Sequence, residues 1–486
     1  MKDRLIAGLD VGTQGARFLV SEPQGHVVAQ GSASIEGKCL DLPDGWAEQD
    51  PTAWWEAVRD AVRQAMGALV ESGYSASELR ALCVDSTSGT VLPVDRRGTP
   101  LTPAIMYNDH RAQEEAQWVN EVGRALTAKL GYQFKSSFGL PKMVWIQHHC
   151  PEVFERTHRF LHAGDWIVGK LTGTFSYSDP SNALKSGYDL MDRRWPAFIE
   201  DDLGIPTAML PTVVPTGTEI GRISKATSEE LGLSRDTRVV AGMTDGTASF
   251  FSTGSVQIGA FASTIGTTLV LKGVSRTIIK DPLGRIYCHV HPDGYWLPGG
   301  ASSTGAECLA RRFGSQDLEA LTNAVEGLPS GLIMYPLVRK GERFPFVHPE
   351  AEGFVVGGPK TEGEWFAGHL EGVAFVERWC YEVVEELGAA VQDHIYSVGG
   401  GSRNRLWLQI RANVLNRTLM RPEIAEAAFG GCIVAARALC YPSLGDAAHA
   451  MVRIQEEVPP DSERVEQYEA LYWRFREECA KRGYGS

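Results

Sequence analysis

Gly8-Leu9-Asp10-Val11-Gly12-Thr13-Gln14-Gly15 carries the strongest local signal in the chain and predicts the start of an α/β domain. The stretch ends the apolar run 5–9 and puts small residues where a strand turns back. Small residues let backbone N–H groups come close to phosphate oxygens, and Thr13 adds a hydroxyl. Asp10 could hold Mg²⁺ directly or through water, because carboxylate oxygen is a hard ligand. A tight hairpin turn with a capping aspartate is the alternative, and the pattern leaves both open.

The residues that follow predict strands, one long helix and strands again. Asp50-Pro51 offers a helix N-cap and a proline at the first helical position, so we expect an amphipathic helix through about Glu71. Strand character is expected at 16–21, 26–32, 82–85 and 90–94. Strands followed by crossover helices predict an α/β fold with a mixed sheet. Neither the Rossmann Gly-x-Gly-x-x-Gly nor the Walker A pattern fits the first turn.

The composition excludes several classes of protein. The 486 residues include 47 Lys+Arg and 60 Asp+Glu, a net charge of −13 without a long basic run, which argues against a nucleic-acid partner. No stretch approaches the ~18 apolar residues of a membrane span, and residues 1–10 do not read as a secretory signal. None of the nine cysteines forms a Cys-x-x-Cys pair, so neither a zinc site nor a disulfide framework is indicated. We expect a soluble, cytoplasmic protein with no membrane partner.

A second cycle of the same pattern begins near residue 237. The apolar run 237–242 leads into Asp245-Gly246-Thr247, much as the first strand leads into Asp10 and its Gly/Thr turn. The parallel predicts a duplicated domain in which each half supplies one acid to a single cleft. A chance echo of four residues is the alternative. We place the boundary so that two domains result, 1–240 and 241–486.

Two further features could carry chemistry. Gly399-Gly400-Gly401 follows the apolar run 395–398 and precedes a helix-like run. Three glycines allow a flat ligand to lie against bare backbone, whereas a tight turn would need only one. Asp245 is the candidate base, because a carboxylate in a water-poor cleft can take the proton of a sugar hydroxyl as that hydroxyl attacks phosphorus. Its alternative role is to cap the turn that follows.

Other polar and aromatic residues have two interpretations each. Asp109 lies in a polar segment after an apolar one; carboxylates often hold polyols, but an ordinary surface loop has the same appearance. The indoles of Trp54, Trp55 and Trp145 lie on helix-like faces, where core packing is favoured over a sugar platform. Lys142 follows Pro141 and is interpreted as a charge at the start of a helix.

Taken in order, these motifs resemble those of the FGGY carbohydrate kinases, sugar kinases of the actin, Hsp70 and hexokinase superfamily. The resemblance runs nearly end to end. The motifs that carry it are Gly8–Gly15, Gly45–Pro51 (Gly-Trp-Ala-Glu-Gln-Asp-Pro), Pro141–Trp145 (Pro-Lys-Met-Val-Trp), 165–173, Gly242–Asp245, Gly266–Thr268, Gly399–Asn404 and Gly430–Ala436.

The resemblance implies two RNase H-like domains with a ligand cleft between them, which close on ATP and an open-chain sugar. The domain 1–240 would bind sugar and phosphate, and 241–486 would carry the base and bind ATP. Asp245 would deprotonate the terminal hydroxyl and Asp10 would position Mg²⁺. The implied phosphate and nucleotide contacts are Gly12, Thr13, Gly266, Thr267, Gly400, Gly401 and Asn404. The implied sugar contacts are Asp10, Thr13, Ser88, Asp109 and Asp245.

The substrate is inferred from two departures within the family. Ser86-Thr87-Ser88-Gly89 stands where xylulokinases typically have Gln-Met-His-Gly, and 84–90 looks more like the ribulokinases. The chain is shorter than typical L-ribulokinases, and Tyr107 replaces the tryptophan usual in xylulokinases. We therefore expect a kinase that uses ATP and Mg²⁺ on a ketopentose, D-ribulose first and D-xylulose second, with a homodimer left open. A catalytically idle sugar sensor and a sugar-independent ATPase of the same superfamily are the rivals.

Overall fold

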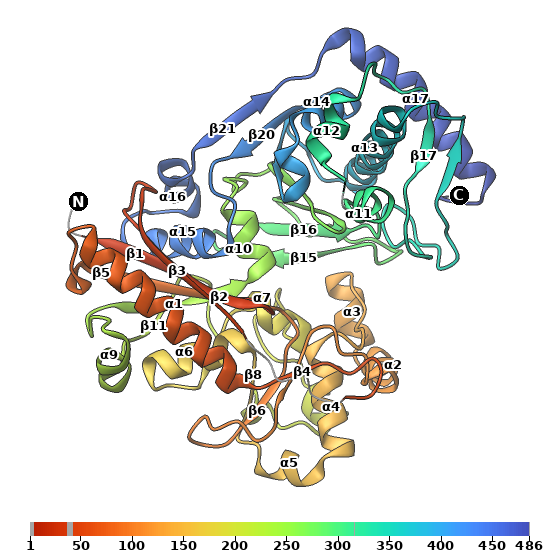
Figure 1. The fold of residues 1–486 in the computed structure, drawn as a ribbon. Helices are drawn as coiled ribbons and strands as arrows, with labels where there is room; N and C mark the ends of the chain where they lie inside the picture. Colours follow the sequence, from red (N-terminus) through yellow and green to blue (C-terminus); the bar gives the residue numbers. More distant parts are fainter. Residues whose placement is uncertain (1–3, 36–41, 315, 486) are drawn as a thin grey trace. The chain divides into compact units, whose positions relative to one another are not determined.

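The computed structural model describes residues 4–35, 42–314 and 316–485, which form two compact units (Figure 1). The first unit contains residues 1–254, 289–294 and 424–452. The second contains 255–288, 295–423 and 453–486. The changeover after Gly254 differs from the division at residue 240 that the sequence suggested, because the strand that precedes Asp245 pairs within the first unit.

A six-stranded mixed sheet forms the centre of the first unit, in the order β11-β12-β5-β1-β2-β3. Its first three strands form an antiparallel meander: β1 (Leu5–Val11), β2 (Gly15–Ser21) and β3 (Val27–Ser34). Two strands run parallel to β1, namely β5 (Leu79–Ser86) and β12 (Arg238–Thr244). The antiparallel edge strand β11 (Glu219–Arg222) completes the sheet. The mixed sheet expected from the sequence is therefore confirmed.

Helix α1 (Pro51–Glu71) packs against β2 and β3, and its start is as predicted. The Asp50 side chain accepts a hydrogen bond from the Thr52 N–H at 2.9 Å, which satisfies one of the free N–H groups of the first turn. Trp54 and Trp55 lie on the buried face, with 1% and 6% of their surface exposed, which confirms their core role.

On the same sheet lies α15 (Ala427–Leu439), which the chain supplies from near its C-terminal end. This helix contacts β1, β5 and the short helix α10 (Asp245–Phe251). Its approach depends on glycine: a Cβ on Gly8 would lie 1.8 Å from the Ala428 carbonyl oxygen, and one on Gly430 would lie 1.9 Å from that of Ala248. The late Gly/Ala-rich motif is thus a packing surface for the sheet of the first unit.

The rest of the first unit is built from short strand pairs and helices. The pairs are β4 (Glu48–Gln49) with β7 (Ala104–Ile105), β6 (Leu92–Val94) with β8 (Arg159–Leu161), and β9 (Tyr177–Ser178) with β10 (Thr212–Val213). The helices are α2 (Gln113–Val122), α3 (Arg124–Leu130), α4 (Gly139–His149), α5 (Pro151–Arg156), α6 (Ala163–Thr172), α7 (Pro180–Ala183), α8 (Phe198–Asp201), α9 (Lys225–Leu231) and α16 (Leu444–Met451).

The sheet of the second unit repeats the strand directions of the first. Its order is β15-β16-β14-β13-β19-β20-β21. The strands are β13 (Phe261–Ile265), β14 (Leu269–Gly273), β15 (Ile286–Val290), β16 (Trp296–Ala301), β19 (His394–Val398), β20 (Thr418–Pro422) and β21 (Ile454–Val458). β19 is parallel to β13, β20 is parallel to β19, and β21 is antiparallel. Two domains of similar topology, as a duplication would produce, are therefore present.

The strand of the second unit that corresponds to β1, however, is not the one that the sequence predicted. The apolar run before Asp245 is β12, the third parallel strand of the first sheet. The counterpart of the Gly12-Thr13 turn between β1 and β2 is therefore the Gly266-Thr267 turn between β13 and β14. The prediction that each half supplies one acid is wrong, because Asp10 and Asp245 both belong to the first unit.

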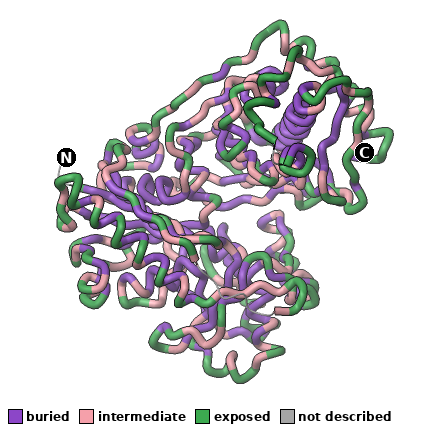
Figure 2. Tube along the Cα trace, viewed as in Figure 1, coloured by how far each residue is buried: buried purple, intermediate pink, exposed green. Residues whose placement is uncertain are grey.

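Helix α13 (Glu362–Glu386) is the buried centre of the helical layer of the second unit (Figure 2). Glu377 on this helix forms an ion pair with Arg411 at 2.7 and 2.8 Å, and both side chains are fully buried. The neighbouring elements are α11 (Glu307–Phe313), α12 (Leu318–Asn323), α14 (Arg405–Leu415), α17 (Ser462–Lys481) and the strand pair β17 (Ile333–Tyr335) and β18 (Phe354–Val356).

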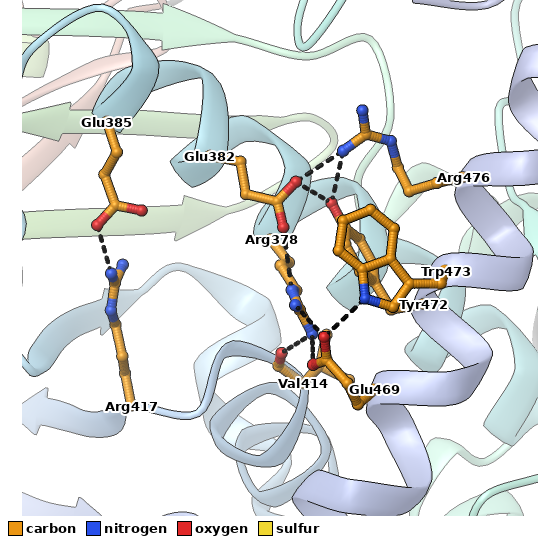
Figure 3. Close-up of polar contacts among 9 residues, drawn as sticks. All are labelled: Arg378, Glu382, Glu385, Val414, Arg417, Glu469, Tyr472, Trp473 and Arg476. Carbon is orange, nitrogen blue, oxygen red and sulfur yellow. Dashed lines mark hydrogen bonds and ion pairs between the residues drawn. The ribbon is translucent and has the colours of Figure 1, made fainter.

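A network of ion pairs attaches α17 to α13 (Figure 3). The Arg378 guanidinium donates to both carboxylate oxygens of Glu469, at 2.6 and 3.0 Å. Glu382 accepts from Arg476 at 2.6 Å and from the Tyr472 hydroxyl at 2.5 Å. A bidentate arginine contact fixes orientation as well as distance, so this network sets the position of the last helix.

The helices and the cysteines can be compared with what the sequence predicted. No helix of the described residues is long and apolar enough to cross a membrane. The eight cysteines other than Cys39 are free thiols, and Cys39 lies outside the described residues.

The glycine contacts of α15 yield a first prediction. Gly430→Ala should lower the free energy of unfolding by ~1–3 kcal/mol, because backbone must shift to admit the methyl group. Gly67→Ala is the matched control: Gly67 is an exposed position of α1 with nothing within 4 Å, so alanine there should stabilise the helix by ~0.5–1 kcal/mol. Urea denaturation of both variants measures the difference, and equal effects would contradict the packing role.

Candidate active site

Three aspartates meet at one edge of the sheet of the first unit. Asp10 stands opposite Asp85 in the parallel pair β1–β5, and Asp85 stands opposite Met243 in the pair β5–β12. Asp245 comes directly after β12. Because the carboxyl ends of parallel strands share one edge, where α/β sheets usually bind ligands, the three acids belong to one site.

Asp85 is a functional candidate that the sequence reasoning missed. Its side chain is fully buried, and neither of its oxygens is reached by a hydrogen-bond donor of the described residues. Burial and then the charge of Asp10 raise the pKa of Asp85 well above its usual range. Burial, opposed by the hydrogen bond from Asp85 and reinforced by the charge of Asp245, raises the pKa of Asp10 to about 6. Ionising both of two such close carboxyls carries a large electrostatic cost, which favours one proton held between them.

The turn that follows Asp10 is a closed hairpin held by the motif Gly45–Pro51. The Gly12 N–H donates to the Gly15 carbonyl at 3.0 Å. The Gln49 amide donates to the Thr13 carbonyl at 2.8 Å, and its own oxygen accepts from the Trp54 indole N–H at 2.8 Å. Gln49 thus couples the turn to α1, which keeps the Gly12 and Thr13 backbone in one conformation.

A cavity of about 630 Å³ opens beside this turn. Asp10, Gly12, Thr13 and Tyr107 are among the residues that line it, and Tyr107 leaves 40% of its surface exposed. The volume is within the usual ~300–1,000 Å³ of small-molecule sites. An exposed aromatic ring and a carboxylate in the same cavity can hold the carbon chain of a polyol while the acid accepts its hydroxyl hydrogens.

Asp245 is the first residue of α10 and is half-buried. Its Oδ1 accepts a hydrogen bond from the Gly246 N–H at 2.6 Å. The N-cap position of α10 is Thr244, so Asp245 does not cap the helix but bonds to the N–H that follows it. This bond fixes the carboxylate at the strand end and is compatible with a role as base.

The structure places Asp109 in an internal ion pair. Its carboxylate is fully buried and accepts from the Ala47 N–H at 2.6 Å and from the Arg111 guanidinium at 2.8 to 3.0 Å. The Arg111 guanidinium stacks 3.7 Å from the Trp46 ring centre and pairs with Glu48 at 2.7 Å. The contacts of Asp109 position neighbouring loops, and its direct contact with sugar remains a prediction.

Lys142 lies in the first turn of α4, as expected, but its side chain is fully buried and binds neighbouring loops. Its ammonium donates to the carbonyls of Gly89 at 2.8 Å, Met106 at 2.6 Å and Ser137 at 3.2 Å. Burial, opposed by the nearby Asp109 charge, lowers the pKa of Lys142 to about 7. One side chain thereby fastens three separate loops, including the turn that carries Ser88 and the segment that carries Tyr107.

The second unit presents the Gly266–Thr268 turn at the corresponding place of its own sheet. The Gly266 N–H donates to the Thr268 carbonyl at 3.0 Å, and the Ala306 N–H donates to the Gly266 carbonyl at 2.8 Å. Gly305 packs directly behind, where a Cβ would lie 2.5 Å from Thr268. The turn has no freedom to collapse, which suits a loop that must present N–H groups to a phosphate.

Glu342 supports this turn and was also missed by the sequence reasoning. Its buried carboxylate accepts from Ser302 Oγ at 2.9 Å, the Ser303 N–H at 2.6 Å and Thr304 Oγ1 at 3.1 Å. The Thr304 carbonyl accepts in turn from the Leu269 N–H at 2.8 Å. Only burial and the loop partners distinguish Glu342 from the many surface glutamates of the chain.

The three glycines after β19 have different roles. A Cβ on Gly399 would lie 2.5 Å from the Ile265 carbonyl oxygen, and one on Gly401 would lie 2.8 Å from the Ile265 side chain. Gly400 has nothing within 4 Å and is exposed. Asn404 caps α14, accepting from the Trp407 N–H at 3.0 Å, and its amide donates to Thr322 Oγ1 at 2.7 Å. Gly400 is therefore the bare backbone that a flat ligand could contact.

The sheet edge that carries Asp10, Asp85 and Asp245 is called the acid edge below. A magnesium ion fits the residues at this edge. No cluster of three or more metal-binding side chains occurs in the part of the chain that the structure describes. Mg²⁺ usually takes one or two carboxylates and completes its shell with water and substrate phosphates. Asp10 at the cavity wall supplies one such carboxylate, and the donor-free carboxyl of Asp85 lies behind it.

Comparison with known proteins identifies the family of the chain. The models of the FGGY family of carbohydrate kinases match the chain, the N-terminal domain over residues 5–252 and the C-terminal domain over 272–439. A xylulose kinase of Staphylococcus epidermidis is 25% identical over 488 residues, which cover 97% of this chain and 96% of the relative. A ribulokinase of Geobacillus thermodenitrificans is 26% identical over 541 residues, covering 98% and 94%.

The crystal structure of a xylulose kinase from Rhodospirillum rubrum superposes with a TM-score of 0.86 at 28% identity, covering 98% of this chain and 99% of that one. Fold and site together define a two-domain sugar phosphotransferase of the actin and hexokinase-like class, for which ATP is the expected co-substrate. The chain belongs to the FGGY family of carbohydrate kinases.

Lys142→Met should weaken the three loops that the ammonium fastens. The carbonyls of Gly89 and Ser137 lose their lysine donor, so we expect a loss of ~1–3 kcal/mol in stability and a KM for sugar raised by about tenfold, with the KM for ATP unchanged. Leu69→Ala, a fully buried position of α1, is the control for lost stability. A sugar KM raised equally in both variants would show that Lys142 acts through stability alone.

Proposed function

We propose that the protein transfers the γ-phosphoryl group of ATP to the terminal hydroxyl of a ketopentose, with D-ribulose preferred and D-xylulose second. The observation that carries the proposal is the set of three aspartates at the carboxyl edge of β1, β5 and β12, beside a cavity of about 630 Å³. Relatives named xylulose kinase and ribulokinase support a ketopentose as the acceptor.

Asp245 is the proposed general base. It lies at the end of the third parallel strand and is fixed by the Gly246 N–H, so its carboxylate can receive a proton without reorganising. As the sugar hydroxyl loses this proton to Asp245, its oxygen bonds to the γ-phosphorus and the bond from phosphorus to the ADP oxygen breaks. Most of the rate enhancement then comes from position and electrostatics, since the protein forms no covalent bond.

The other predicted residues bind and orient. Asp10 would hold Mg²⁺, with Asp85 behind it, and the ion when bound would neutralise charge on the phosphates. Backbone groups at Gly12, Thr13, Gly266 and Thr267 would contact the transferred phosphoryl group. Gly400 and Gly401 would seat adenosine, with Asn404 holding the start of α14 in place.

The preference for D-ribulose rests on the turn after β5. Ser86-Thr87-Ser88-Gly89 has only small polar side chains, and the Thr87 and Thr90 hydroxyls bond to each other at 3.2 Å. D-ribulose and D-xylulose differ in the configuration of one hydroxyl, and a hydroxyl of the wrong hand leaves a buried polar group unpaired. The cytoplasmic location and the homodimer expected from the sequence stay predictions.

An ADP-release assay with Mg·ATP tests the substrate. We would compare D-ribulose, D-xylulose, L-ribulose, L-xylulose, ribitol and glycerol. The proposal predicts the highest kcat/KM for D-ribulose, followed by D-xylulose. Hydrolysis of ATP that no sugar stimulates would support an ATPase instead, and sugar binding in calorimetry without turnover would support a sensor.

Asp245→Asn should lower kcat by at least ~10²-fold while sugar still binds, because the amide cannot accept the proton but keeps the shape of the side chain. Asp60→Asn, an exposed acid on α1, serves as the control and should leave kcat unchanged. Stopped-flow turnover together with sugar titration calorimetry separates catalysis from binding. Wild-type turnover in Asp245→Asn would remove this residue from the mechanism.

A further inference from the structure

The turn after the central strand β5 is held more tightly than a surface turn requires. Gly89 has φ +77°, and a Cβ there would lie 2.6 Å from the Ser137 carbonyl oxygen. The Gly89 carbonyl is bound by the buried ammonium of Lys142 at 2.8 Å. Ser88, the residue before it, therefore projects from a fixed backbone at the same sheet edge as Asp10 and Asp245.

A second lysine reaches Ser88 from another element. Lys185 lies in the short 3-10 turn Leu184–Ser186, and its ammonium donates to Ser88 Oγ at 2.7 Å. The ammonium also stands 5.3 Å from the centre of the Phe138 ring. Among the ion pairs formed by described residues, none includes Lys185, so its charge is offset by no carboxylate of its own.

The 3-10 turn that carries Lys185 is itself anchored. Ser186 Oγ bonds to His162 Nε2 at 2.8 Å, and His162 Nδ1 bonds to Asp165 at 2.6 Å. All three side chains are buried. The backbone of Lys185 is thus held in place, and its ammonium is positioned by Ser88 and Phe138.

The direction of the Lys185 hydrogen bond has a chemical consequence. An ammonium only donates, so Ser88 Oγ is the acceptor, and the hydroxyl hydrogen of Ser88 remains to be donated to another group. The pair therefore offers donors, namely the Ser88 O–H and the remaining Lys185 N–H groups. The acid edge offers the opposite: ionised carboxylates only accept.

A keto oxygen has the matching chemistry. A carbonyl oxygen accepts and cannot donate, and a hydrogen bond that involves an ionised donor is about twice as strong as a neutral one. The hydroxyl of a polyol can turn to other partners and gains less from a group of donors. We infer that Ser88 and Lys185 are specificity-determining residues that bind the carbonyl oxygen of an open-chain ketose, an inference that rests on the proposed ketose kinase activity.

The test compares a ketose with its reduced counterpart. The kcat/KM of the full-length wild type, Ser88→Ala and Lys185→Met would be measured with D-ribulose, and ribitol would be measured as a substrate or as a competitive inhibitor. Each variant should lose ~10- to 100-fold in kcat/KM for D-ribulose, while the affinity for ribitol and the KM for ATP change by less than about threefold. Lys170→Met is the matched control, because its ammonium stands 5.0 Å from the Trp55 ring and makes no contact with Ser88.

Three other outcomes would count against the inference or against the proposed function. An equal loss for D-ribulose and ribitol in Ser88→Ala, the variant least able to disturb folding, would show a structural role and overturn the inference. Unchanged kinetics with D-ribulose would do the same. If the wild type phosphorylates no ketopentose, the proposed function fails, and calorimetry with D-ribulose alone then decides the inference: binding lost in Ser88→Ala supports it, and binding retained overturns it.

Discussion

The approach of two carboxyl groups, Asp10 and Asp85, is the constraint on which the chemistry of the candidate site depends. The register of β1 and β5 places the two acids side by side, and the helix α15 packs over both strands without supplying a donor to Asp85. A Cβ on Gly431 would lie 3.5 Å from Asp85 Oδ2, so the bare helix face keeps water away from this carboxyl. Burial then makes one shared proton cheaper than two charges, and the acid edge is ready for a cation or for the hydroxyl hydrogens of a polyol.

The two units share one strand topology but place different residues at the corresponding turns. Both sheets contain a meander of antiparallel strands followed by parallel ones, and both turn at a Gly/Thr loop after the first strand. In the first unit, aspartates stand at the carboxyl edge; in the second, the Gly266–Thr268 turn and the glycines after β19 provide bare backbone. In the proposed function, the acids of the first unit serve the acceptor and the bare backbone of the second unit contacts the nucleotide.

Much of this could be predicted from sequence because local rules determine it. The N-cap at Asp50, the Gly/Thr turns and the core role of Trp54 depend on neighbouring residues, and the structure contains them as expected. The unit to which Asp245 belongs could not be predicted from neighbouring residues. It depends on the pairing of β12 with β5, which are more than 150 residues apart in the chain. Asp85, Lys142 and Glu342 were missed or misinterpreted for the same reason: their roles depend on burial and on partners in distant segments.

Phosphorus NMR of the reaction mixture tests the central claim, that the acid edge activates a sugar hydroxyl for phosphoryl transfer. The wild type is incubated with Mg·ATP and D-ribulose, and the same is done with Asp245→Asn. The account predicts a phosphomonoester on the terminal carbon of the sugar, formed with one ADP per ester by the wild type and at least ~10²-fold more slowly by the variant. Release of inorganic phosphate without a sugar ester, or ester formation by Asp245→Asn at the wild-type rate, would contradict it.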